Sequence, residues 1–233
     1  MQGGVGAHCR LLAQTLIQQG HSVSVFSDHR AASDDADIAL DKETKRWRYG
    51  TMRKIKNWAK REHLDLVNLH YQTAAYRMSP WIHFMPDILK PVPVITTFHD
   101  LRFPYLFPKA GRLRDWIVMR LAKASSGVIT TNHEDAEVLK HLPHHQLIPI
   151  GSSVSIDLPD DFDWATWRNR SGAASDEFLV GHFGFMNHSK GIDTLLEAVT
   201  ALDDAVPVKL LMIGGRTGTS DRTNASYADW IDR

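Results

Sequence analysis

Three short segments of this 233-residue chain combine residue types that bind phosphate or sugar. The first is Gly3-Gly4-Val5-Gly6, a glycine loop directly before a helical pattern. Glycine lets a ligand approach the backbone, and the free N–H groups and dipole of a helix start favour an anion. The segment therefore predicts a site for a diphosphate or a carboxylate, although a tight turn without a ligand has the same composition.

The second segment is Thr96-Thr97-Phe98-His99-Asp100, at the carboxyl end of a predicted strand. Open α/β sheets bind their ligands at that edge. A histidine there can hydrogen-bond a sugar hydroxyl or move a proton near neutral pH, and a neighbouring aspartate can orient it or accept a proton. We therefore expect His99 and Asp100 to be catalytic. The structural alternative is that His99 ends the strand and Asp100 begins a turn.

The third segment is Lys190-Gly191, at the start of a predicted helix that follows a predicted strand. A lysine beside free N–H groups at a helix start predicts a second phosphate site. The alternative is a solvated surface lysine, which is the commonest environment of this residue type.

A nicotinamide-binding fingerprint is a competing interpretation of the first segment. Gly4 and Gly6 match the first half of Gly-x-Gly-x-x-Gly, and Asp28 ends the next predicted strand. However, Cys9 occupies the third glycine position. A nicotinamide-dependent sugar-modifying enzyme therefore stays open as an alternative function.

Helical patterns alternate with short β-branched runs, which indicates an α/β fold with a mostly parallel sheet. The first helix carries its apolar stripe from Val5 to Ile17 and ends at Gly20. Strands are expected at residues 22–26, 64–70, 92–98, 127–131, 146–150, 178–183 and 208–213, and further helices at 51–62, 113–123, 134–141, 192–202 and 225–233.

The elements divide into two Rossmann-like domains. Residues 1–150 form the first domain and residues 177–233 a partial second domain. Between them, residues 151–176 are rich in serine, proline and aspartate and read as a connection with about one helical turn. We expect a fragment, because no strand precedes the glycine loop and only two strands follow the connection.

The composition of the chain limits the classes of partner that it is expected to bind. Lys+Arg and Asp+Glu both number 27, so no overall field attracts nucleic acid. The single cysteine, Cys9, excludes an internal disulfide and fits a reducing, cytoplasmic location. No apolar run approaches the length of a membrane span. The basic stretch Lys42–Arg61 is a solvated helix face or, alternatively, a peripheral contact for phospholipid headgroups or a phosphorylated acceptor.

His141, His144 and His145 are close in sequence, but Pro143 breaks any helical face between them. Three histidines bind a metal only when their ring nitrogens converge. We therefore expect no metal site from this group.

Several motifs together resemble the GT-B glycosyltransferases of family 4. Gly3-Gly4-Val5-Gly6, its helix, and Gly20-His21-Ser22-Val23-Ser24-Val25 are similar to the opening of these enzymes. Residues 184–198 resemble the donor-domain segment, and Pro149-Ile150-Gly151 resembles the motif before the interdomain crossover. The motifs occur in the expected order over nearly the whole chain.

This resemblance implies two Rossmann-like domains of the GT-B type, the first facing the acceptor and the second binding the donor nucleotide. The donor would be a nucleoside diphosphate sugar, used as a substrate without a metal or a separate cofactor. The acceptor would be a saccharide, a lipid-linked compound or a small molecule, and the reaction would retain anomeric configuration. His99 would lie beside the transferred sugar. Donor or substrate binding would fall to Gly3, Gly4, Gly6, Gly184, Asn187, Lys190 and Gly191.

The chain departs from the family pattern at two positions. Phe185 stands where many members carry an arginine, and Ile150 stands where an asparagine is common. The paired glutamates of the later donor segment would lie beyond Arg233. A catalytically inactive remnant or binding module is therefore a second candidate function.

Overall fold

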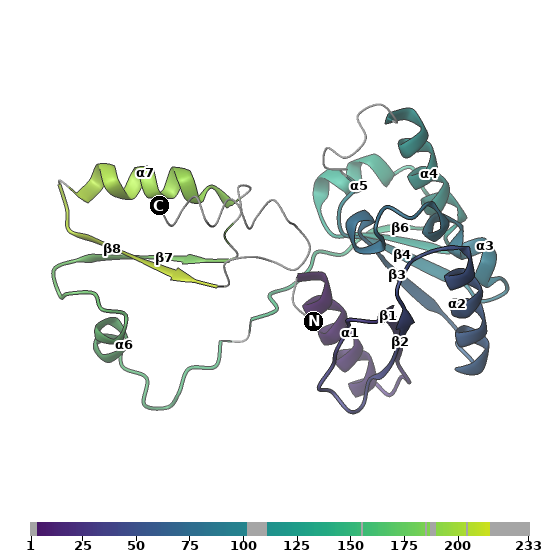
Figure 1. The fold of residues 1–233 in the computed structure, drawn as a ribbon, viewed down its shortest axis with the longest axis horizontal. Coiled ribbons are helices and arrows are strands. Elements are labelled where there is room, and N and C mark those ends of the chain that lie inside the picture. Colours follow the sequence, from purple (N-terminus) through teal and green to yellow (C-terminus); the bar gives the residue numbers. More distant parts are fainter. Residues whose placement is uncertain are drawn as a thin grey trace. The chain divides into compact units, whose positions relative to one another are not determined.

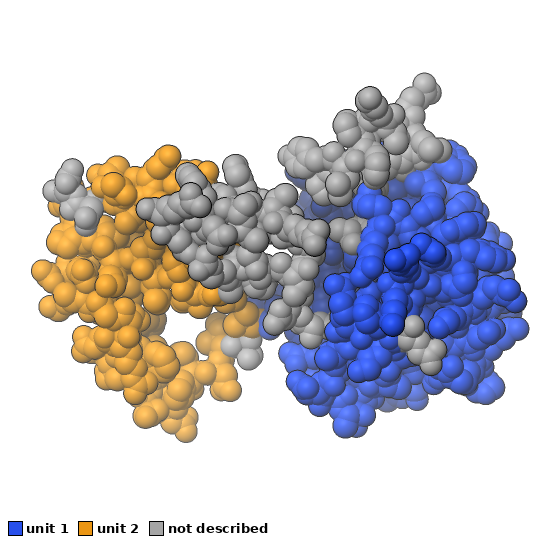
Figure 2. Space-filling model, in the orientation of Figure 1, with its two compact units in different colours: residues 1, 3–153 blue, residues 2, 154–233 orange. Residues whose placement is uncertain are grey.

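The computed structural model describes residues 4–101, 111–154, 156–184, 186, 190–203 and 205–214. The chain divides into two compact units, one built from residues 3–153 and the other from residues 154–233 (Figure 2). Each unit is described by itself below.

The first unit alternates helices with short strands, as the periodicity predicts (Figure 1). Its elements in chain order are α1 (Gly4–Gln18), β1 (Ser24–Asp28), β2 (Ala39–Thr44), α2 (Tyr49–Arg61), β3 (Val67–Tyr71), the 3₁₀ helices η1 (Thr73–Tyr76) and η2 (Pro80–Phe84), α3 (Met85–Leu89), β4 (Val94–Phe98), α4 (Gly111–Ala124), β5 (Gly127–Thr130), α5 (His133–Leu139) and β6 (His145–Leu147).

All strand pairs among the described residues of this unit are parallel. β3, β4, β5 and β6 form one sheet in that order, with Tyr71 opposite Phe98 and Phe98 opposite Thr130. β1 and β2 form a separate two-stranded sheet. In the described part of the unit, the strands therefore make two parallel sheets and not the single sheet that we predicted.

β2, α3 and the two 3₁₀ helices were not predicted. β2 carries Ala-Leu-Asp-Lys-Glu-Thr, and half of these residues are charged, so the segment lacks the apolar character of the other strands. α3 spans only five residues and has a proline in its first turn. β2 is too polar, and α3 and the 3₁₀ helices are too short, to give a periodic signal.

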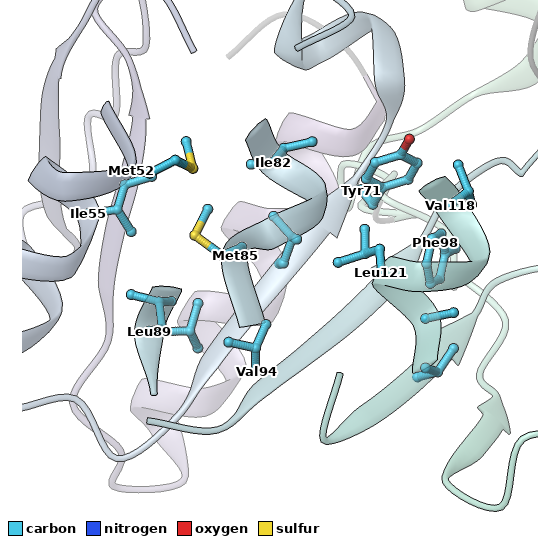
Figure 3. Close-up of a cluster of buried hydrophobic side chains, with 14 of the residues drawn as sticks. Met52, Ile55, Tyr71, Ile82, Met85, Leu89, Val94, Phe98, Val118 and Leu121 are labelled. Atoms are coloured by element: carbon cyan, nitrogen blue, oxygen red, sulfur yellow. The ribbon is translucent and has the colours of Figure 1, made fainter. Parts of the chain in front are cut away.

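The core of the first unit lies between the four-stranded sheet and the helices packed on it (Figure 3). Tyr71 and Phe98, the last residues of β3 and β4, are fully buried. Val118 and Leu121 of α4 pack in the same cluster. The carboxyl ends of these two strands are thus held by close packing, and residues that follow them directly are held in a fixed frame.

The second unit contains α6 (Trp164–Arg170), β7 (Phe178–Phe183), α7 (Ile192–Asp203) and β8 (Val208–Ile213). β7 and β8 pair in parallel with Val180 opposite Leu210, and α7 connects them and packs on β8 (Figure 1). The helical turn expected in the connection is the seven-residue α6, which Asp163 caps through Thr166. The helix predicted at 225–233 lies outside the described residues.

Candidate active site

Three histidines from separate elements converge at the carboxyl edge of the four-stranded sheet. His8 comes from α1, His70 from β3, and His99 directly follows β4. The ring centroids are 5.5 Å apart for His8 and His70, 5.4 Å for His8 and His99, and 5.3 Å for His70 and His99. His70 Nδ1 and His99 Nε2 are 3.0 Å apart, which is hydrogen-bonding distance. We refer to these three residues as the histidine cluster.

The backbone around the cluster is fixed by the sheet. The His99 N–H donates to the carbonyl of Tyr71 at 3.1 Å, which extends the β3–β4 ladder by one residue. The Tyr76 hydroxyl donates to the carbonyl of His70 at 2.8 Å. The backbones of His70 and His99 are therefore both fixed by hydrogen bonds at the carboxyl ends of β3 and β4. The fold, and not a mobile loop, sets the distance between the two rings.

Burial keeps the cluster neutral. Burial, together with the neighbouring His99 and His8, lowers the pKa of His70 to about 3. Burial, followed by the proximity of His8, lowers the pKa of His99 to about 4. Burial also lowers the pKa of His8. At neutral pH each ring therefore offers one N–H donor and one nitrogen acceptor, which suits a sugar hydroxyl better than a phosphate.

Asp100 is exposed and follows His99. The backbone beyond it is anchored by Asp135, whose carboxylate accepts from the Leu101 N–H at 3.1 Å and from Asn132 Nδ2 at 2.8 Å. The proposed catalytic role of Asp100 stays a prediction. The rings of His70 and His8 both contact His99, and neither was among the predicted site residues.

The glycine segment is helical, so the predicted glycine loop is wrong for the described residues. α1 begins at Gly4, and Gly6 lies in its first turn. Neither residue has a positive φ. The helix extends over both because nothing in this stretch breaks it, and the unpaired N–H groups of the first turn still point outward from this end. Gly3 lies outside the described residues, and the binding roles of Gly4 and Gly6 stay predictions.

In the second unit, two of the predicted glycines occupy positions that require glycine. Gly184 directly follows β7 with φ +148°, and Gly191 precedes α7 with φ +63°. The Gly191 carbonyl accepts the Leu195 N–H at 2.9 Å, the first bond of α7. Lys190 is exposed beside this helix start, and its phosphate-binding role stays a prediction. Asn187 lies outside the described residues.

Asp28 is already engaged by basic groups. Arg30 donates to its carboxylate through its side chain at 2.8 Å and its N–H at 3.1 Å, and His29 lies 3.1 Å away. Burial alone would raise the pKa of Asp28, but the hydrogen bonds from Arg30 hold it below its ordinary value. The carboxylate that the nicotinamide alternative assigns to a ribose hydroxyl is thus already hydrogen-bonded within the chain.

The histidines that are close in sequence do not converge. His145 Nε2 is 2.9 Å from the Thr130 hydroxyl, His144 Nε2 is 3.4 Å from the carbonyl of Ala122, and His141 Nδ1 is 3.1 Å from that of Val138. By contrast, His70 could have been found from its position, whereas no local sequence pattern marks His8. His70 is the next-to-last residue of β3, which pairs with β4, and parallel strands bring their carboxyl ends to one edge.

Parallel α/β units with polar residues at the carboxyl ends of their strands define a Rossmann-like, ligand-binding class of protein. The structure is similar to that of sucrose-phosphate synthase from Thermosynechococcus elongatus, with a TM-score of 0.71 and 18% sequence identity, over 99% of this chain and 61% of that one. This likeness shows a GT-B fold.

Residues 2–152 match the model of Glycosyltransferase Family 4, and the chain belongs to that family. It is also 25% identical over 239 residues to a phosphatidyl-myo-inositol mannosyltransferase of Propionibacterium freudenreichii subsp. shermanii, a match that covers 94% of this chain and 60% of the relative. The chain thus spans about 60% of the length of this curated relative. The family predicted from the motifs is confirmed.

Among the described residues, no helix combines the length and the apolar character that crossing a membrane requires.

Proposed function

We propose that this chain acts in the transfer of a hexosyl group from a nucleoside diphosphate sugar to a saccharide, lipid-linked or small-molecule acceptor. The observation that carries the proposal is the neutral histidine cluster at the carboxyl edge of the first unit, in a chain of Glycosyltransferase Family 4. A hexosyl group presents several hydroxyls, and neutral imidazoles can both donate to and accept from them.

In this proposal His99 hydrogen-bonds the transferred sugar, and His70 is the positioning residue. The 3.0 Å contact between His70 Nδ1 and His99 Nε2 restricts rotation of both rings. A ring fixed before the substrate arrives loses less conformational freedom on binding. Asp100 remains a candidate for proton transfer at the exposed rim.

The leaving diphosphate needs positive charge. We assign this role to Lys190 together with the N–H groups at the start of α7. The first turn of α1 contains no acidic residue, which leaves its N-terminal dipole available for an anion as well. Charge neutralisation of this kind requires no metal, so we propose metal-independent transfer, with retention of anomeric configuration and no separate cofactor.

A lipid-linked acceptor is favoured by the surface of α2. Thr51, Met52, Ile55, Trp58 and Ala59 form the buried face of this helix. Arg53, Lys54 and Lys60 are exposed. Each basic residue near an anionic bilayer contributes about 1 kcal/mol to binding. We propose that α2 contacts anionic headgroups peripherally at a cytoplasmic membrane face, where a lipid-linked acceptor resides. The name of the mannosyltransferase relative, which includes a phosphatidyl-inositol acceptor, supports this.

The test of the proposed function is calorimetric titration of the chain with uridine and guanosine diphosphates, together with an assay for release of the diphosphate from UDP-glucose and GDP-mannose. Saturable binding of one diphosphate and slow release from its sugar form are expected. Lack of binding by both, with no release from either sugar nucleotide, would overturn the proposal.

A further inference from the structure

We propose that His8, His70 and His99 form a binding site for one divalent transition-metal ion, with Zn²⁺ as the best match. The proposal goes beyond the proposed transferase function, to which we assign no metal. It rests on the first unit alone, because all three residues belong to residues 3–153.

The geometry of the cluster is close to that of a three-histidine metal centre. One ring nitrogen from each residue lies within 4.8 Å of the others. Zn–N bonds of about 2.0–2.1 Å at tetrahedral angles place two ligand nitrogens about 3.3 Å apart. His70 Nδ1 and His99 Nε2, at 3.0 Å, need to separate only slightly. His8 needs the larger adjustment, which a rotation of its side chain on α1 can supply.

The donor set selects the class of ion. Three imidazole nitrogens suit zinc, cobalt, nickel and copper, whereas magnesium and calcium require oxygen ligands. All three rings are half-buried, so an ion can enter from solvent without unfolding the unit.

Three protein ligands leave the fourth zinc position open for water or another small ligand. A metal bound here separates His99 Nε2 from His70 Nδ1 and so changes the ring orientation that we propose for sugar binding. Because we propose transfer without a metal, zinc at this site competes with the sugar and inhibits the reaction. The site would thus make the enzyme sensitive to free transition metals.

The test is titration of the chelator-treated chain with Co²⁺, followed by visible absorption, and with Zn²⁺, followed by calorimetry. One equivalent of Co²⁺ should give the intense d–d bands of four-coordinate cobalt, and Zn²⁺ should displace it. His8→Gln and His70→Gln should each weaken binding at least tenfold, since even outer-shell changes cost 10–100-fold. The matched control is His141→Gln, which removes an exposed histidine outside the cluster and should leave binding unchanged.

Absence of a stoichiometric cobalt spectrum would overturn the proposal, and so would His8→Gln and His70→Gln variants that bind as tightly as the wild type. His8→Gln is decisive if His70→Gln fails to fold, because His8 lies in the early part of α1 outside the buried core. No nucleotide is added, so failure of metal binding is distinguishable from failure of the diphosphate titration.

Discussion

The proposed function depends more on His99 than on any other single residue. The motif Thr-Thr-Phe-His-Asp indicated its place at a strand end, and the structure puts it there, beside His70. Its ring is neutral because burial holds its pKa at about 4. It therefore acts as a hydrogen-bonding group at neutral pH and not as a cation.

Substitution of His99 by glutamine should slow release of the diphosphate from the sugar nucleotide by about 10²-fold, since one preorganised hydrogen bond at the reacting group is lost. The affinity for the free diphosphate should change little, because the phosphate-binding role is assigned to Lys190 and the start of α7 and not to His99. Steady-state kinetics and calorimetry measure the two effects separately. The proposed role of His99 would be contradicted by equal turnover in the two proteins.

His83 makes stability depend on pH. Burial lowers its pKa in the folded state, with Arg120 adding to the effect and the bond to the Pro80 carbonyl opposing it. Its Nε2 lies 2.8 Å from the buried Tyr71 hydroxyl. Because the folded pKa lies below the unfolded value of about 6.5, the unfolded chain binds more protons in this range. The stabilising contribution is thus fully present above pH 6.5 and declines as the pH falls below it.

Urea unfolding at a series of pH values from neutral to mildly acidic checks this dependence. We expect His83→Gln to flatten the slope below about pH 6.5 by up to about 1.4 kcal/mol per pH unit. Other buried histidines contribute to both proteins, so the difference between the two slopes reports His83. Identical slopes would show that His83 does not titrate on unfolding.

Among the secondary-structure elements, β7 and β8 show why glycine ends a strand. Gly214 follows β8 with φ +145°, and a Cβ at this position would collide with the Gly184 backbone at the end of β7. The two strand ends therefore approach each other more closely than any side chain allows. This fixes the edge of the sheet beside the start of α7.

Gly214→Ala should destabilise the chain by about 1–3 kcal/mol, the usual cost of forcing a side chain into a region reserved for glycine. Gly181→Ala is the matched control, because it lies within β7 and its added Cβ would meet nothing within 4 Å. Thermal unfolding followed by circular dichroism compares the two. Equal melting temperatures for both variants would contradict the close approach at Gly214.

Helix α2 carries the proposed membrane contact. The double variant R53E/K60E should lose most cosedimentation with vesicles that contain anionic lipid, while added salt should weaken binding of the wild type. K123E/R170E is a control with the same change in net charge at exposed positions on other helices. Equal loss of vesicle binding by both double variants would contradict the proposal that α2 contacts the membrane.

For the molecule as a whole, periodicity predicted the order of helices and parallel strands, because β-branched runs and apolar stripes are local signals. It did not reveal β2, whose residues are largely charged, or the division of the first unit into two sheets, which depends on long-range pairing. The histidine cluster was only partly predictable. His99 lies in a conspicuous motif, but its contacts with His8 and His70 arise from tertiary packing over dozens of residues.

Two-dimensional NMR of the histidine rings, recorded as a sugar nucleotide and its free diphosphate are added in turn, tests most directly whether the transferred sugar binds at the histidine cluster. Saturation with the sugar nucleotide should shift the ring resonances of His70 and His99 and leave that of His141 in place. The free diphosphate should shift them less. Saturable binding of the sugar nucleotide with no change at His70 and His99 would contradict this assignment.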